Sequence, residues 1–171
     1  MKRTLALALT AAMILSLAAC SKQDTDSFAQ DFADGSDIII GGSVQIPNPW
    51  TIHDTLADMN AATGLNFIVP DTADGLPISL VQEMGTLAEV RYSDGEREIT
   101  LRKGEGTDDV SSDNNAYREE STLEVGGNTL TIKGENGTIS LAVWIDDGYS
   151  YSISCSGLTE EIIADIAAAV K

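Results

Sequence analysis

The stretch NTLTIKGENGTISLAVWIDDGYSYSISC, residues 128–155, alternates apolar and polar side chains around two groups of turn-forming residues. Alternation with a period of two is typical of strands that bury one face, and Gly, Asn and Asp favour the turns that join such strands. We expect a four-residue loop at 134–137 and a three-residue loop at 146–148. The stretch therefore predicts three consecutive antiparallel strands.

The two loops set which residues face each other across neighbouring strands. The first places Ile132 opposite Ile139, and the second places Val143 opposite Tyr151. These apolar pairs share one face, because side chains alternate between faces and a slip of one residue exchanges them. In this register Trp144 lies on the polar face.

Two further turn signals lie upstream. Asp94-Gly95 is typical of a two-residue hairpin and places Val90 opposite Ile99. Gly126-Gly127 supplies another turn and places Leu123 opposite Leu130. Together with the first stretch, these turns predict a meander of about six or seven antiparallel strands.

Two segments have the pattern of helices that cover an apolar sheet face. Thr51 is a suitable N-cap for a helix over 51–63, which Gly64 ends. Thr159 is a suitable N-cap for a second helix, whose apolar stripe contains Ile162, Ile166 and Val170. The fold class is therefore predicted as α+β, a curved antiparallel meander covered by one or two helices.

Composition excludes several functions. The 171 residues include 10 Lys and Arg against 27 Asp and Glu, and the formal net charge is −17. Such an acidic chain lacks the basic face that nucleic acids require. A single His and two Cys are too few for a Cys/His zinc site. We expect no nucleic-acid partner, no metal and no cofactor, and a monomer.

The amino-terminal residues have the pattern of an export signal. Lys2 and Arg3 precede an apolar run over 5–18, and Leu17-Ala18-Ala19-Cys20 follows. This start resembles a bacterial lipoprotein signal with its lipobox. The resemblance implies cleavage before Cys20 and acylation of its sulfur. We divide the chain into a signal peptide (1–19), a lipidated Cys with a flexible acidic tether (20–43), and one α+β domain (44–171).

A doubly acylated cysteine is a stable membrane anchor, whereas one acyl chain binds only reversibly. The expected location is therefore the cell membrane, with the domain on its extracytoplasmic side. The acidic charge is repelled by anionic lipid, so the acyl chains are expected to be the only membrane contact.

Several short motifs lie between Asn48 and the end of the chain. They are Asn48-Pro49-Trp50, Arg91-Tyr92 before Asp94-Gly95, the run 98–104, Asp109-Val110-Ser111, Ala142-Val143-Trp144, the run 148–153 and Gly157-Leu158. On these motifs the chain resembles a domain of unknown function. That domain recurs in lipoproteins and in the outer portions of membrane-anchored proteins, mainly of Gram-positive gut bacteria. The resemblance implies no catalytic residues.

The segment 104–115 is rich in carboxylates and amides: Asp108, Asp109, Asp113 and Asn114. Such oxygens suit Ca²⁺, but the EF-hand spacing is absent, and an acidic surface loop has the same composition. Its length is unusual for a simple strand connection. We expect it to pack on the helices or to contact a ligand.

Two tryptophans and a cysteine complete the candidate residues. Trp50 and Trp144 are candidate binding aromatics, with core cover as the alternative. Cys155 and His53 would form a nucleophilic pair only if they were adjacent. The apolar pattern around Cys155 instead favours a buried small side chain.

These observations predict a non-catalytic binding or sensing module at the cell surface. The alternative is a carboxylate-dependent hydrolase of the cell envelope, with Asp108, Asp109 and Asp113 as its first candidates. Hydrolysis of this kind needs two carboxyl groups at a defined separation in a cleft.

Overall fold

A computed structural model describes residues 48–171 of the chain. The signal peptide, Cys20 and the acidic tether lie outside these residues. The elements in chain order are β1 (Thr51–Ile52), α1 (Leu56–Thr63), β2 (Thr72–Ala73), β3 (Leu76–Met84), β4 (Leu87–Ser93), β5 (Glu98–Glu105), β6 (Glu119–Val125), β7 (Asn128–Glu135), β8 (Thr138–Asp146), β9 (Tyr149–Leu158) and α2 (Glu160–Ala169).

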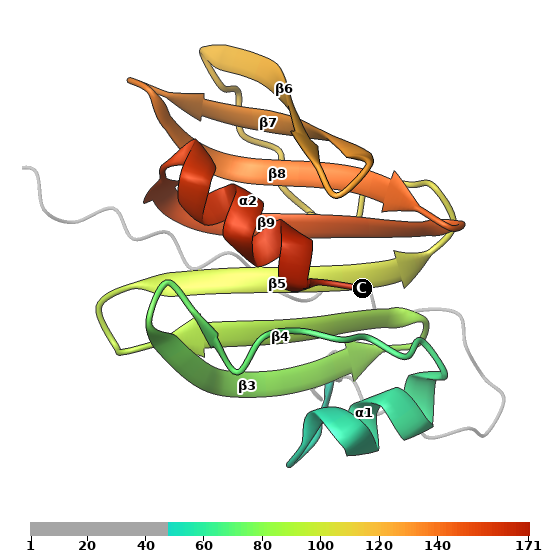
Figure 1. Ribbon diagram of the computed structural model, residues 1–171. Coiled ribbons are helices and arrows are strands. Elements are labelled where there is room, and N and C mark those ends of the chain that lie inside the picture. The colour runs from blue at the N-terminus through green and yellow to red at the C-terminus, as the bar shows by residue number, and fades with distance from the viewer. Residues whose placement is uncertain (1–47) are drawn as a thin grey trace, which may run out of the picture. The chain divides into compact units, whose positions relative to one another are not determined.

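All strands pair antiparallel in a nine-stranded sheet. The strand order is β1-β3-β4-β5-β9-β8-β7-β6, with the short β2 paired to β3. Helix α2 lies across one face, and α1 lies beside β3 (Figure 1). The α+β class and the antiparallel sheet are confirmed. The sheet combines two hairpin runs, β3–β5 and β6–β9, that meet where β5 pairs with β9.

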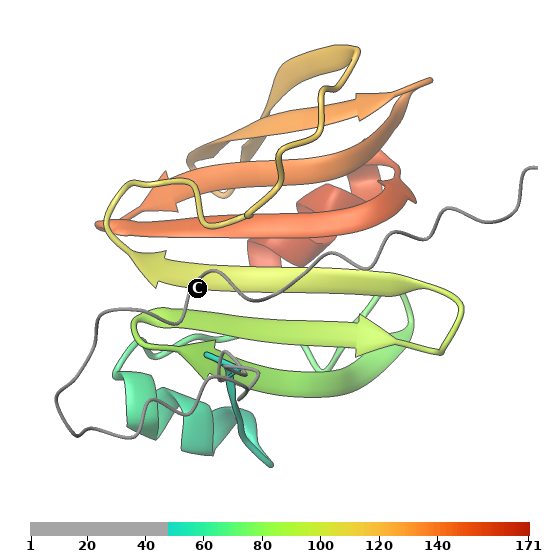
Figure 2. The same cartoon turned by 180° about the vertical axis from the view of Figure 1, so that it is seen from behind.

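The connection from β5 to β6 spans residues 106–118, which we call the crossing loop. Strands β9, β8 and β7 lie between β5 and β6, and the antiparallel steps leave β5 and β6 pointing the same way. The chain must therefore return along one strand length and across four strand spacings, on the order of 25 Å by 19 Å. It does so over the face opposite α2 (Figure 2). The length of the acidic segment thus follows from the topology, and the segment does not pack on α2.

The hairpin between β8 and β9 differs from the predicted register by one residue. Asp147 and Gly148 have φ values of 48° and 81° and form a two-residue turn, so Trp144 pairs with Tyr151 and not Val143. A one-residue shift exchanges the faces of β8. Trp144 consequently lies in the core, and the predicted polar-face position was wrong.

The β7–β8 hairpin also closes with two residues, Asn136 and Gly137, both with positive φ. This turn type matches the twist of the flanking strands, so it replaces the predicted four-residue loop. Irregularities near Gly134 and Ser140 shift the pairing further, and Ile132 faces Ala142 instead of Ile139. The predicted pair with Ile139 was therefore wrong.

At the β4–β5 turn the loop is longer than predicted. The Asp94 carboxylate accepts hydrogen bonds from the backbone N–H groups of Glu96 and Arg97, at 3.0 and 2.8 Å. These bonds stabilise a four-residue connection, so Val90 pairs with Leu101 and not with Ile99. The predicted pair of Leu123 with Leu130 is confirmed.

Helix α1 begins later than predicted. Thr51 is paired with Glu83 as part of β1, and Thr55 is the N-cap, with its hydroxyl accepting from the N–H of Asp58. The C-terminal stop at Gly64, with φ of 74°, agrees with the prediction. Thr159 caps α2 as predicted, accepting from the N–H of Ile162.

The hydrophobic core lies on the sheet face that carries α2, which we call the inner face. Its largest fully buried apolar side chains are Tyr92, Phe67, Met59, Leu76, Ile99, Leu101, Leu130, Ile153 and Ile163. The segment after α1 closes this core, because Ile68 and Lys171 exchange two backbone hydrogen bonds of 2.9 and 3.0 Å. The opposite, outer face carries the crossing loop (Figure 2).

At the irregularity between β7 and β8, the backbone of Thr138 lies close to Gly134, and a substitution of Gly134 tests this contact. A Cβ at this position would lie 1.9 Å from the carbonyl oxygen of Thr138, so Gly134→Ala forces the backbone apart. We expect a loss of about 3 kcal/mol in the free energy of unfolding, measured with urea. Gly137→Ala is the control, because its Cβ meets nothing and only the positive φ costs about 1 kcal/mol. Equal losses in the two variants would contradict the described hairpin.

Candidate binding site on the outer face

The outer face is polar where strands β3, β4 and β5 meet. Gln82 lies opposite Glu89, and Glu89 lies opposite Arg102, so the three side chains form a row across the sheet. Glu89 is 0 % exposed, although a carboxylate is rarely fully buried without partners. Its environment therefore decides what this face can do.

Three hydrogen bonds and a further ion-pair contact, from three side chains, hold the Glu89 carboxylate. Oε1 accepts from Gln82 Nε2 and Arg91 Nε, both at 2.6 Å. Oε2 accepts from Arg102 Nε at 2.7 Å, and Arg102 Nη2 forms an ion pair with the same oxygen at 2.7 Å. Two guanidinium groups thus offset the desolvation cost of burying one carboxylate.

This arrangement also sets the protonation state. Burial by itself raises the pKa of Glu89, but the hydrogen bonds from Arg102 and Arg91 outweigh it and lower the pKa below the ordinary 4.5. Glu89 is therefore ionised at neutral pH. A group held in this way serves as a structural anion and not as a proton donor.

Arg102 connects the sheet to the crossing loop. Its Nη1 donates to the carbonyl oxygens of Val110, at 3.2 Å, and of Ser111. The Trp50 ring lies over the same guanidinium, 5.8 Å from ring centroid to Cζ. One side chain thus fixes the position of the loop above strands β4, β5 and β9.

The loop is shaped by its own polar side chains. The Asp109 carboxylate accepts from the N–H of Ser111 at 2.8 Å. Asp113 accepts from the N–H of Asn115 at 2.7 Å and from the Tyr117 hydroxyl at 2.5 Å. Burial acts to raise the pKa of Asp113, but the Tyr117 hydrogen bond and the Asn115 hydrogen bonds lower it. These carboxylates therefore act first as hydrogen-bond acceptors within the loop.

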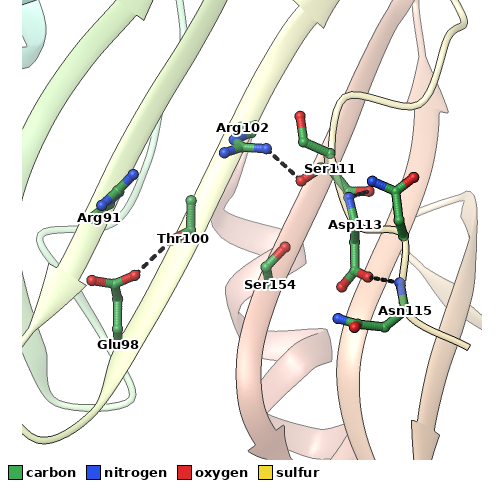
Figure 3. Close-up of a pocket in the computed structure, with 10 residues that line it drawn as sticks. Arg91, Glu98, Thr100, Arg102, Ser111, Asp113, Asn115 and Ser154 are labelled. Carbon is green, nitrogen blue, oxygen red and sulfur yellow. Dashed lines mark hydrogen bonds between the residues drawn. The ribbon is translucent and has the colours of Figure 1, made fainter. Parts of the chain in front are cut away.

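A pocket of about 460 Å³ lies between the loop and the sheet. Its floor is formed by Arg91 of β4, by Glu98, Thr100 and Arg102 of β5, and by Ser154 of β9, and its wall is residues 111–115 (Figure 3). Thr100 donates to Glu98 at 3.5 Å along the floor. Every lining side chain is polar, so the pocket offers both hydrogen-bond donors and acceptors.

The structure separates the predicted loop residues. Asp113 and Asn114 line this pocket, whereas Asp109 lines a different hollow beside β8, and Asp108 is exposed and lines neither. Among residues 48–171, no three His, Cys, Asp or Glu side chains are grouped so as to hold a metal ion. The arrangement thus gives no support to calcium in this loop.

The two tryptophans have different environments. Trp50 stacks on Arg102 at the outer face, next to the pocket. Trp144 is 5 % exposed and stacks on Tyr151 of the core, with ring centroids 5.1 Å apart and planes 6° apart. Trp144 is therefore part of the hydrophobic core. Trp50 is close enough to the pocket to contribute to the outer-face site.

Cys155 and His53 are not brought together. His53 follows β1 at one side of the sheet, 4.0 Å from Glu83, and three strands separate β1 from β9, which carries Cys155. Burial raises the pKa of the Cys155 thiol, which donates to the carbonyl oxygen of Ile139 at 3.2 Å. The thiol is half-buried against the core, and a thiol with a raised pKa is not an activated nucleophile.

Sequence reasoning missed Glu89. It lies between Ala88 and Val90 and would have been assigned to a solvated face. The available signal is cross-strand charge: once the β4–β5 register is correct, Glu89 faces Arg102 directly.

The model of a protein family, described as a domain of unknown function (DUF4367), matches residues 73–170. The match begins after the Asn48-Pro49-Trp50 motif and includes strands β3 to β9 and the whole of α2. No curated protein and no solved structure matches the chain. Within residues 48–171, neither helix has the length and apolar character needed to cross a bilayer.

Glu89→Gln tests the buried charge network. The variant keeps the shape of the side chain but leaves two guanidinium groups without their anion, so we expect a loss of about 3 kcal/mol in unfolding free energy at pH 7. Because the folded-state pKa is lowered, the stabilisation by Glu89 is present above pH 4.5 and is lost as the pH falls through the folded value. Urea unfolding should therefore show the two proteins converging at acidic pH.

Glu96→Gln, at an exposed turn position, is the matched control and should change stability by no more than about 0.5 kcal/mol. A difference between wild type and Glu89→Gln that stays constant or grows on acidification would contradict the network.

Proposed function

Since the chain belongs to the DUF4367 family, whose function is unknown, its role has to be inferred from its own residues, and we propose a lipid-anchored binding or sensing module outside the cytoplasm. The lipobox residues Leu17 to Cys20 support the anchor and the location. The polar pocket beneath the crossing loop supports the binding role.

The single observation that carries the binding role is the wholly polar lining of that pocket, which brings donors and acceptors together in one place. Arg91 donates its Nε to Glu89, and within residues 48–171 the other N–H groups of its guanidinium form no hydrogen bond. Thr100 and Ser154 offer hydroxyls, and Glu98 and Asp113 offer carboxylate oxygens. A ligand dense in hydroxyl and amide groups, such as a sugar of the cell envelope, has the complementary chemistry.

The lowered pKa of Asp113 favours binding over hydrolysis with this residue as the general acid. A glycosidase-type general acid needs a raised pKa, whereas hydrogen bonds lower that of Asp113. Of the three acids named for the hydrolase alternative, Asp113 alone lines this pocket. These features support a site that holds a ligand and does not cleave it.

The anchor is tested by Cys20→Ser. Removal of the sulfur removes the acylation point, so we expect the variant to lose incorporation of an alkyne-labelled fatty acid and to leave the membrane fraction. Cys155→Ser is the control and should incorporate label like the wild type. Equal labelling of Cys20→Ser and wild type would contradict the anchor.

The pocket is tested by adding N-acetylglucosamine or its β-1,4 disaccharide to the purified protein. Binding to the folded state raises the Tm, and we expect a rise of about 5 °C at a concentration near ten times the Kd. Thr100→Val removes one hydroxyl from the floor and should weaken binding about tenfold. The control Thr122→Val lies on the exposed face of β6 and should bind like the wild type.

Chromatography of the same samples distinguishes the two roles. Recovery of intact disaccharide supports binding alone, and release of monosaccharide would contradict the non-catalytic role. Absence of any Tm shift with either sugar at about 50 mM would contradict a sugar ligand.

A further inference from the structure

A second pocket lies on the inner face. It shares no lining residue with the polar pocket of the outer face. Its volume is about 470 Å³. It is bounded by the segment after α1, the β6–β7 turn, the β8–β9 turn and the carboxyl end of α2. The end of α2 and the strands behind it are visible in Figure 1.

Lys103 is the unusual residue of this pocket. It lies on β5 on the inner face, in step with Ile99 and Leu101, and is only 5 % exposed. Lysine is almost never fully buried unless it is paired. Among residues 48–171, however, Lys103 forms no ion pair and no hydrogen bond. Its ammonium group has three donors that no oxygen of the described chain accepts.

Two tyrosine rings hold this ammonium in place. Nζ lies 4.5 Å from the ring centroid of Tyr149 and 5.3 Å from that of Tyr151. Tyr151 is in turn stacked on Trp144. Ring faces attract a cation but accept no strong hydrogen bond, so the charge is positioned at the pocket while its donors stay available.

The other lining groups limit the charge of a ligand. Asp146 and Asp147 are the acids of the pocket, Lys171 is its second cation, and the carboxyl end of α2 adds the negative end of a helix dipole. Burial lowers the pKa of Lys103, and the two aspartates oppose that effect. A dianion such as a phosphate monoester meets repulsion here, whereas a single carboxylate matches one ammonium.

Part of the remaining wall is apolar and suits a hydrocarbon body, and Asn66 and Asn128 complete the lining. Leu65 and Ile68 come from the segment after α1, Val125 from β6, and Ala167 and Val170 from the end of α2. Together with the two tyrosine rings they give the pocket an apolar part besides its charged groups. A ligand of this shape has one charged end and one apolar end.

We propose that this pocket binds an apolar monocarboxylate, whose carboxylate pairs with Lys103 and whose hydrocarbon or aromatic part lies against Leu65, Val125 and Val170. Such a group occurs both in a free organic acid and at the carboxyl terminus of a peptide that ends in an apolar residue. This site is independent of the outer-face pocket and of its ligand.

The test is calorimetric titration of the purified protein with phenylacetate, N-acetyl-phenylalanine and the neutral phenylacetamide. We expect saturable binding of at least one carboxylate, and binding of phenylacetamide about tenfold or more weaker than that of phenylacetate. This comparison requires no variant. Tighter binding of N-acetyl-phenylalanine assigns the site to peptide ends, and tighter binding of phenylacetate assigns it to free acids.

Lys103→Met removes the charge but keeps an unbranched apolar side chain that the rings can contact, so the variant is expected to fold. It should weaken carboxylate binding about tenfold or more. The control Lys133→Met removes a cation of β7 that is paired with Glu120 of β6, and it should bind within about twofold of wild type. Unchanged phenylacetate affinity in Lys103→Met, equal binding of acid and amide, or no binding of either acid at about 20 mM would overturn the proposal.

Discussion

The buried carboxylate of Glu89 is the constraint around which the outer face is organised. It lies at the centre of a row of paired strands and is accessible to no solvent, so its charge has to be matched by neighbours. Arg102 supplies most of that match and also donates to two carbonyl oxygens of the crossing loop. The same guanidinium thus stabilises the sheet and positions the wall of the polar pocket.

The topology explains why a loop lies there at all. Strand β5 is followed in the sheet by β9, and the chain must cross β9, β8 and β7 before β6 can begin. The crossing places a polar segment over a sheet face that would otherwise be open to solvent (Figure 2). The space left between the crossing loop and the sheet is the polar pocket, so the connectivity of the strands creates the candidate site. The inner face obtains its own cover from α2 and the segment after α1, and the gap at the end of that cover is the pocket of Lys103.

Local patterns predicted the fold class better than they predicted the register. The strand alternation, the Gly126-Gly127 turn and the Thr159 cap depend on neighbouring residues, and each agrees with the structure. Register depends on how many residues a turn uses. A two-residue turn at Asp147 and Gly148 in place of three residues was enough to move Trp144 from the predicted surface into the core.

The candidate site was predictable only in part. Asp113 and Asn114 were identified from composition, but the floor beneath them comes from β4, β5 and β9, whose meeting depends on the long-range pairing of β5 with β9. No turn signal specifies that pairing. The burial of Glu89 and Lys103 was not predicted for a related reason. Charged residues are expected on the surface, and partners from distant strands decide whether they are buried.

The coupling between Glu89 and Arg102 is the property on which the outer-face site depends. A double-mutant cycle with Glu89→Gln, Arg102→Met and the combined variant measures it as a difference of unfolding free energies. A direct buried pair predicts a coupling of about 2 kcal/mol or more, because the second substitution costs little once the first partner is gone. Additive effects, with a coupling below about 0.5 kcal/mol, would contradict an outer face held together by this pair.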